Sequence, residues 1–194
     1  MVDGPIGLAV LDEFARHWRD RRRGGAAMPT LSDYLDRPHP TLQPWTIIID
    51  LADGSWPVRL CGTGMADMMG SDFTGGDYLT AVRPSERGEI VARDRTCATH
   101  PCGLRLNMVA RTAEGRLIDN AVLVLPVSRA GGHSLVRVSA ARRTAGWSDP
   151  PLAVLGYTAA AWVDVDHGVP VVAPWFNPRA ARADGAGTIR RLPS

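Results

Sequence analysis

The stretch of residues 56–76, WPVRLCGTGMADMMGSDFTGG, constrains the fold of this chain more than any other. Its first part alternates apolar and polar side chains as a half-buried strand does, with Trp56, Val58 and Leu60 expected on one face. Glycines then end the strand, a Met-rich turn of helix follows over 65–69, and another glycine closes it. The stretch therefore predicts a strand, a glycine turn, a one-turn helix and a second glycine turn.

Periodicity and turn residues place the other elements along the chain. Apolar residues at helical spacing predict an amphipathic helix over 8–20, and Thr30 with Asp33 is typical of the start of a short helix. Ser85 is the expected cap of a longer helix that ends near Thr99. The remaining strands are expected over 45–51, 103–112, 117–127 and 134–142, with a brief helical turn over 77–82. These elements predict an α+β fold: a five-stranded antiparallel sheet with short helices on one face, an N-terminal amphipathic helix and a C-terminal extension.

The length of 194 residues suits one domain with extensions. We expect an N-terminal helical cap over 1–43, a core over 44–143 and a C-terminal extension over 144–194. The extension begins with a shift to Ala, Gly and Pro, and its last part, 179–194, is expected to be disordered. The apolar run 152–163 is expected to dock on the domain's own surface, with docking on a partner as the alternative.

Composition and charge exclude several classes of function. A net charge of +2 is too small to indicate binding to nucleic acid or to an acidic membrane surface. No apolar run reaches the roughly 20 residues that a membrane span needs. Three cysteines without a disulfide spacing favour a reducing compartment, so the expected location is the cytoplasm. The sequence has no nucleophile elbow, HExxH or phosphate-loop motif, which argues against an enzyme.

The central stretch resembles a known family. The run Arg59-Leu60-Cys61-Gly62-Thr63, followed after a helical turn by Gly70-x-Asp72-x-Thr74-Gly75, resembles the core of PAS domains, in particular a subgroup best known from alphaproteobacteria. Trp18 and Met28-Pro29 resemble the N-terminal motif of that subgroup, and the resemblance spans roughly residues 8–143. It implies a stand-alone sensor or adaptor module of bacterial signal transduction, which binds a small molecule, a signalling protein partner, or both.

A PAS-like arrangement implies a ligand site between one sheet face and the helices that cover it. The side chains expected to line this site are Leu60, Met65, Met69, Phe73, Tyr78, Ile90, Asp94, Cys97, Leu106, Met108 and Val136. Methionines adapt to irregular gaps, so the set suits either an adaptable ligand site or a filled core. Asp94 indicates a site if it points inward, although an ordinary surface charge beside Arg93 or Arg95 is the favoured interpretation.

The apolar stripe of the first helix is the expected dimer interface. Its residues recur at positions i, i+3, i+4 and i+7 and are Leu11, Phe14, Ala15 and Trp18. PAS domains commonly dimerise through such surfaces, so the resemblance implies a homodimer. The basic run 21–23 after the stripe is interpreted as a solvated helix end, with contact to an acidic partner as the alternative.

Several cofactors and rival functions stay as alternatives. His100 lies on the element where some PAS sensors hold haem, but no second histidine stands at ligand spacing, so no metal site is expected. Cys97 lies outside the motif of covalent flavin photosensors, which leaves noncovalent flavin. Residues 164–168 match only a fragment of a calcium loop, which chance explains. A small α+β cone-type enzyme or lipophilic-ligand carrier, with Asp94 and a histidine in its cavity, is the main rival, and a purely structural domain is another.

Overall fold

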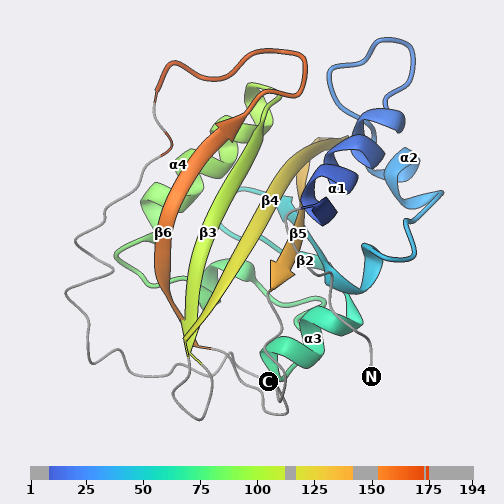
Figure 1. The fold of residues 1–194 in the computed structure, drawn as a ribbon. Coiled ribbons are helices and arrows are strands. Elements are labelled where there is room, and N and C mark those ends of the chain that lie inside the picture. Colours follow the sequence, from blue (N-terminus) through green and yellow to red (C-terminus); the bar gives the residue numbers. More distant parts are fainter. Residues whose placement is uncertain (1–8, 112–116, 142–152, 173, 175–194) are drawn as a thin grey trace.

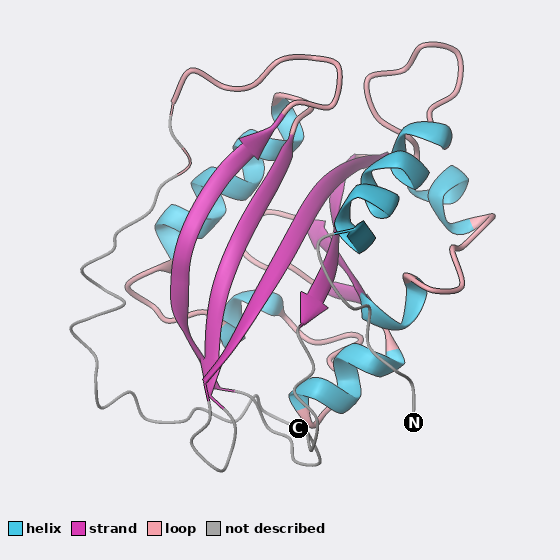
Figure 2. Ribbon diagram, in the orientation of Figure 1, coloured by secondary structure: helices cyan, strands magenta, loops and turns pink. Residues whose placement is uncertain are grey.

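The computed structural model describes residues 9–111, 117–141, 153–172 and 174. Its centre is one sheet of six strands in the order β2-β1-β5-β4-β3-β6. The strands are β1 (Thr46–Leu51), β2 (Val58–Cys61), β3 (Gly103–Arg111), β4 (Leu117–Arg129), β5 (Gly132–Ala141) and β6 (Ala153–Val163). The helices are α1 (Ala9–Asp20), α2 (Leu31–Leu35), α3 (Thr63–Met69) and α4 (Arg87–Thr99), with 3₁₀ turns η1 (Gln43–Trp45) and η2 (Tyr78–Ala81). Figure 1 shows α1 and α4 on opposite sides of the sheet, and Figure 2 shows the strands as one curved layer between them.

The sheet confirms the predicted α+β class and adds one strand. β1 pairs with both β2 and β5, so the N-terminal hairpin and the meander of β3, β4 and β5 form one antiparallel sheet. The additional strand is β6, which pairs with β3 from Gly103↔Val163 to Arg111↔Ala153. The apolar run therefore docks on the domain itself, as predicted. The predicted count of five strands is wrong, because this run also takes up the main-chain hydrogen bonds of the β3 edge.

The predictions for the C-terminal extension can be compared with the structure only in part. The disordered segment expected at 179–194 lies outside the described residues. The predicted domain limits at 43 and 143 stay a prediction, although strand pairing carries the sheet past the second limit, to β6.

One side of the sheet, called here the α1 face, is covered by α1 and α2. Phe14 and Trp18 are fully buried there in a cluster that includes Ile48, Leu125 and Val136 from the strands. The apolar stripe Leu11, Phe14, Ala15 and Trp18 is thus packed against the chain's own sheet. Dimerisation through this stripe stays a prediction, and it would require α1 to leave the sheet.

The opposite side, called here the α4 face, is covered by α3, η2 and α4. Cys97 of α4 packs on Leu104, Val124 and Leu135, whereas Ile90 packs on a second cluster that contains Trp56. Neighbouring residues of a strand point to opposite faces, so burial on both sides leaves few strand positions exposed. The short helices of the core therefore cover one face, as the sequence predicted, and the N-terminal helices α1 and α2 cover the other.

A bulge in β2 decides which way its side chains point. Ile48 pairs with Leu60 and Ile49 pairs with Val58, so Arg59 is an extra residue in that strand. An extra residue reverses the alternation of side chains beyond it. Leu60 consequently packs on the α1 face, while Trp56 packs on the α4 face.

Capping residues set where two of the helices begin. Thr30 begins α2 as predicted, because its Oγ1 accepts a hydrogen bond from the N–H of Asp33 at 3.0 Å. The predicted cap of α4 is wrong, since Glu86 and not Ser85 precedes its first helical residue. The N–H of Glu86 donates to the carbonyl oxygen of Arg83 at 2.9 Å, and Ser85 is enclosed in the turn that this bond closes.

Glycines fix both ends of α3. A Cβ atom on Gly62 would lie 2.3 Å from the carbonyl oxygen of Gln43, so only glycine fits at this start. Gly70 ends the helix in the left-handed conformation with φ of 77°. The strand, glycine turn, short helix and glycine turn predicted for residues 56–76 are all present.

Candidate functional site

The layer between the α4 face and its helices gathers most of the predicted ligand-site residues. Those found there are Tyr78, Ile90, Asp94, Cys97, Leu106 and Met108. Met65 and Met69 pack with Trp45 in a separate cluster beside α3. Phe73 is half-buried in the segment that follows α3. The layer is therefore the candidate site, and we describe it from α4 toward the sheet.

Two members of the predicted set lie on the wrong side of the sheet. Leu60 and Val136 both pack in the cluster beneath α1. The bulge at Arg59 turns Leu60 away, and strand alternation places Val136 opposite Leu135, which packs with Cys97. Neither can line a site together with residues of the α4 layer, because the sheet separates them.

Asp94 is the most deeply buried charged side chain of this layer. Its side chain is 0% exposed, and that of Arg93 is 4% exposed. Oδ1 of Asp94 accepts a hydrogen bond from Nε of Arg93 at 2.8 Å and forms an ion pair with Nη2 of the same residue, also at 2.8 Å. Oδ2 is buried and has no hydrogen-bond partner among the described residues. The favoured interpretation of Asp94 as a surface charge is thus wrong, although Arg93 is its partner as expected.

The position of Asp94 on α4 explains its burial. It lies four residues after Ile90 and three before Cys97, so all three share the helix face that packs on the sheet. An apolar side chain at this place would complete the packing, whereas a carboxylate with one unpartnered oxygen costs stability. The oxygen can accept a hydrogen bond from any donor that enters the layer.

A second buried polar contact joins η2 to the sheet. Arg137 of β5 is 6% exposed, donates from Nη1 to the hydroxyl of Tyr78, and places its guanidinium 4.9 Å from the Tyr78 ring centre. Tyr78 also stacks on Trp56, with ring centres 6.4 Å apart. Because Tyr78 lies in a short 3₁₀ turn, this contact ties a surface segment to the centre of the sheet.

Sequence reasoning missed Arg137, and with it two further buried polar residues of the same face. Asn120 of β4 is 3% exposed with its Oδ1 unpartnered among the described residues, and Ser139 of β5 is 4% exposed. The continuous apolar run 121–125 of β4 was the available signal. A strand that is apolar on both sides lies between two covered faces, so the polar residues of its neighbour are buried as well.

The two cysteines at the end of α4 are structural. The Cys97 thiol donates to the carbonyl oxygen of Cys102 at 3.0 Å, and both side chains are 0% exposed. Interaction with the Cys102 thiol, followed by burial, raises the pKa of Cys97 well above its ordinary value. Cys97 is therefore a protonated thiol at neutral pH and a poor nucleophile.

His100 follows the last residue of α4 and keeps a buried Nε2 without a hydrogen-bond partner among the described residues. Among all the residues that the structure describes, no three His, Cys, Asp or Glu side chains are grouped so that they could hold a metal ion. The haem and flavin alternatives stay predictions. None of the helices in the described ranges combines the length and apolar character that a membrane crossing requires.

Comparison with known proteins identifies the family. No curated protein and no solved structure matches the chain at a significant level. The profile described as PAS domain matches residues 9–138, which include α1, both layers described above and most of the sheet. The matched range ends within β5 and does not include β6. The chain belongs to the PAS domain family.

Proposed function

We propose that this protein is a sensor or adaptor module of bacterial signal transduction and that the α4 layer is where it receives its signal. Membership of the PAS family supports a signalling role, and the finer assignment is carried by one observation. Asp94 keeps a fully buried carboxylate oxygen without a partner among the described residues, on the helix face that packs against the sheet. A buried polar atom without a partner is a candidate contact for a bound molecule.

The chemistry of the layer indicates the kind of molecule that it would accept. The unpartnered atoms of Asp94 and Asn120 are both acceptors, Oδ2 and Oδ1. A small molecule that carries N–H groups, such as an amine, an amidine or an amide, would satisfy them, whereas a carboxylate would not. A donor at Asp94 would also change the charge balance of its pair with Arg93, and α4 would then shift against the sheet.

The main rival function is less well supported by the geometry. A cone-type enzyme needs a base or acid beside Asp94, and the sequence suggested a histidine for this role. Arg93 is the hydrogen-bonding partner of Asp94, and His100 lies six residues away in the sequence, beyond the end of α4. Arg93 occupies one oxygen of this carboxylate, and the other is buried without a partner among the described residues, which favours binding over proton transfer.

Thermal unfolding with a panel of small amines, amidines, amides and carboxylates tests the proposal. Compounds with N–H donors should raise the midpoint of the wild-type protein, and Asp94→Asn should abolish the rise. Glu89→Gln is the matched control, because Glu89 is exposed on the same helix. Native mass spectrometry and an absorbance spectrum of the freshly purified protein would show a ligand retained from the cell, haem and flavin included. Equal responses of the wild type and Asp94→Asn to every compound would reject Asp94 as the receiving group.

A further inference from the structure

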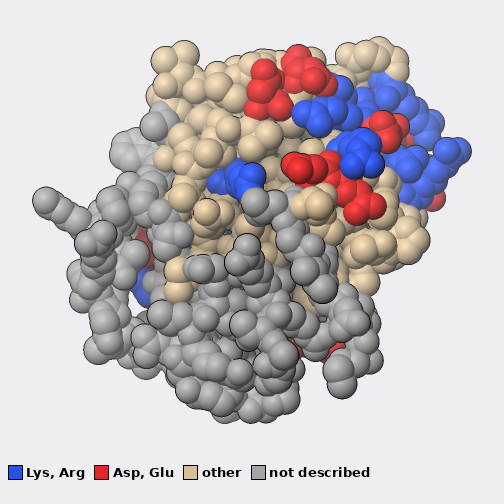
Figure 3. Space-filling view, in the orientation of Figure 1, with Lys and Arg blue, Asp and Glu red and all other residues tan. Residues whose placement is uncertain are grey.

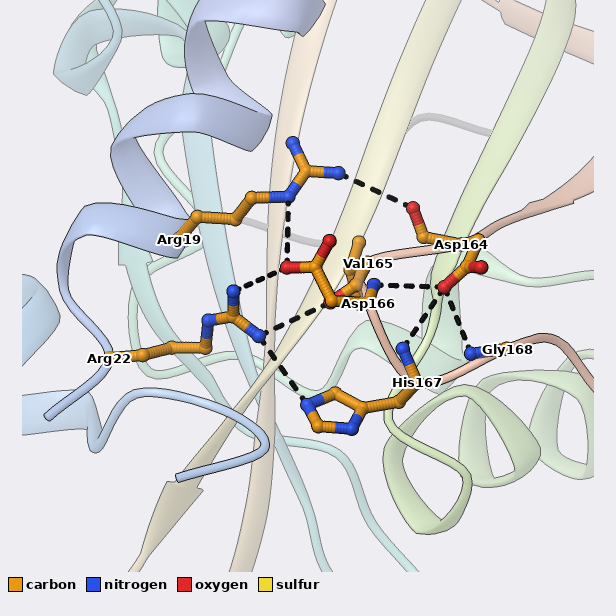
Figure 4. A network of polar contacts seen from close by, with 7 residues as sticks. All are labelled: Arg19, Arg22, Asp164, Val165, Asp166, His167 and Gly168. Carbon is orange, nitrogen blue, oxygen red and sulfur yellow. Dashed lines mark hydrogen bonds and ion pairs between the residues drawn. The ribbon is translucent and has the colours of Figure 1, made fainter. Parts of the chain in front are cut away.

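Arg19 of α1 and Arg22, two residues after its end, clamp the turn that follows β6 (Figure 4). Nη2 of Arg22 and Nε of Arg19 both contact Oδ2 of Asp166, the latter at 3.5 Å. The same guanidinium groups donate to main-chain oxygens, Arg19 to that of Asp164 and Arg22 to that of Val165, each at 3.3 Å. The clamp thus binds one carboxylate and the peptide backbone that leads to it.

An apolar socket lies beside the clamp. The side chain of Val165 is 0% exposed and packs in the cluster that contains Phe14 and Trp18. The Arg22 guanidinium lies 5.5 Å from the Trp18 ring, so the aromatic side chain supports the cation. Socket and clamp together hold an apolar residue and the acidic residue after it.

The turn keeps its own shape. Oδ1 of Asp164 accepts the backbone N–H groups of Asp166, His167 and Gly168 at 2.8, 3.0 and 2.9 Å. Asp166 has a φ of 83°, a left-handed conformation that few residues other than glycine adopt. These bonds lie within the turn, so its form does not depend on the two arginines.

We propose that this socket and clamp form a docking site for an acidic peptide segment of a partner protein, which Val165 and Asp166 occupy as an internal competitor. The partner segment would carry an apolar residue followed directly by Asp or Glu. In the described part of the chain, Arg22 also contacts the Trp18 ring and Nε2 of His167, the latter at 3.4 Å. The other contacts of the two arginines in this turn are to main-chain oxygens and a carboxylate, which any peptide with this pair offers. Figure 3 shows basic and acidic side chains gathered together at the end of the molecule where α1 lies.

Of the internal occupant, Val165 is buried and must be displaced by a partner segment, whereas the acidic residue is open to solvent and exchanges more readily. The side chain of Asp166 is 54% exposed, and ion pairs in contact with water contribute little to stability. The site lies on the α1 face, on the other side of the sheet from Asp94, so the inference does not depend on the function proposed for the α4 layer.

The test is binding of a fluorescein-labelled peptide with the sequence of residues 162–170, WVDVDHGVP, measured by fluorescence anisotropy. In Val165→Ser/Asp166→Asn the internal competitor is weakened, and the peptide should bind about ten-fold more tightly than to wild type, because more of the protein is competent to bind. Asparagine keeps the left-handed backbone at position 166 while it removes the charge. If the double variant does not fold by circular dichroism, Asp166→Asn alone decides, with a smaller gain expected.

Substitutions of the two clamp arginines test whether the peptide binds at this site. Arg19→Ala/Arg22→Ala, introduced into the weakened variant, should abolish binding, whereas Arg16→Ala, an exposed arginine of the same helix, should not change it. A peptide with Asn in place of the central Asp should bind about five-fold more weakly. Equal affinity for wild type and the weakened variants, or binding that survives loss of both arginines, would overturn the proposal. The proposal would also be overturned if light scattering showed that the weakened variants form dimers and that added peptide does not dissociate them. A second copy of the chain would then fill the site.

Discussion

The indole Nε1 of Trp18 donates a hydrogen bond to the carbonyl oxygen of Pro126, 2.7 Å away, and so joins residues 108 positions apart in the sequence. Pro126 is tolerated in β4 because β3 pairs with β4 only as far as Val124. The missing N–H of Pro126 therefore costs no hydrogen bond to β3. The bond fixes the depth and rotation of α1 on the sheet, since the indole is 0% exposed.

Trp18→Phe should therefore lower the free energy of unfolding. We expect a loss of about 1–3 kcal/mol, because the carbonyl of Pro126 loses its buried donor and the smaller ring leaves a gap. Urea unfolding followed by circular dichroism measures the change, with an unaltered m-value. Arg16→Ala is the control on the exposed side of α1 and should change the free energy by less than about 0.5 kcal/mol. Equal stability of Trp18→Phe and wild type would mean that the indole bond does not hold the helix.

The buried pair of Arg93 and Asp94 should behave as a unit. Asp94→Leu alone leaves a buried guanidinium without its carboxylate, and we expect it to lose about 3–5 kcal/mol of stability. Arg93→Met/Asp94→Leu removes both charges and should be more stable than the single variant. Guanidinium chloride unfolding of the single and double variants measures the coupling. A double variant less stable than Asp94→Leu would contradict this account.

The stability of α1 on the sheet should depend on pH through His17. Burial first, and then the positive charge of Arg21 and the neighbouring His39, lower the pKa of His17 from its ordinary value of 6.5. The unfolded chain then binds a proton at a higher pH than the folded one. The free energy of unfolding should therefore be constant with respect to this group above pH 6.5 and should fall as the pH drops below that value.

His17→Leu tests this dependence, because Nε2 of His17 has no hydrogen-bond partner to lose among the described residues. The free energy of unfolding in urea is measured at intervals from about pH 8 to pH 5, and the difference in this free energy between wild type and variant is plotted against pH. The difference should change only on the acid side of the window. A difference that is the same at every pH would show that His17 does not titrate with folding.

Two glycines offer a matched pair of substitutions. Gly62→Ala would bring a Cβ to 2.3 Å from the carbonyl oxygen of Gln43 and 2.5 Å from that of Pro44, so backbone must move. We expect it to destabilise the protein by more than about 2 kcal/mol. Gly88→Ala has open space around it in α4 and should stabilise by about 0.5–1 kcal/mol through helix propensity. Thermal unfolding midpoints that shift in the same direction for both would refute the packing argument.

Local sequence was sufficient for the elements and for the family. The stripe on α1, the β-branched run of β1 and the cap at Thr30 each act within a few residues, and all three were predicted where they occur. The glycines around α3 carry the resemblance that the PAS profile confirms over 9–138. Within the candidate site, Tyr78, Ile90, Asp94, Cys97, Leu106 and Met108 lie in the predicted layer.

Only the tertiary structure decided which side of the sheet each residue occupies and whether a charge is buried. A single extra residue at Arg59 moves Leu60 to the other face, and periodicity along one strand does not reveal it. Arg137 is buried beneath Tyr78, 59 positions away in the sequence, and Asp94 is buried because α4 packs on the sheet. The pairing of β6 with β3, and the docking of its turn on α1, are long-range choices that an apolar run does not encode locally. Sequence periodicity sets the shape of each element, whereas burial is a property of its neighbours, and these are chosen by the fold as a whole.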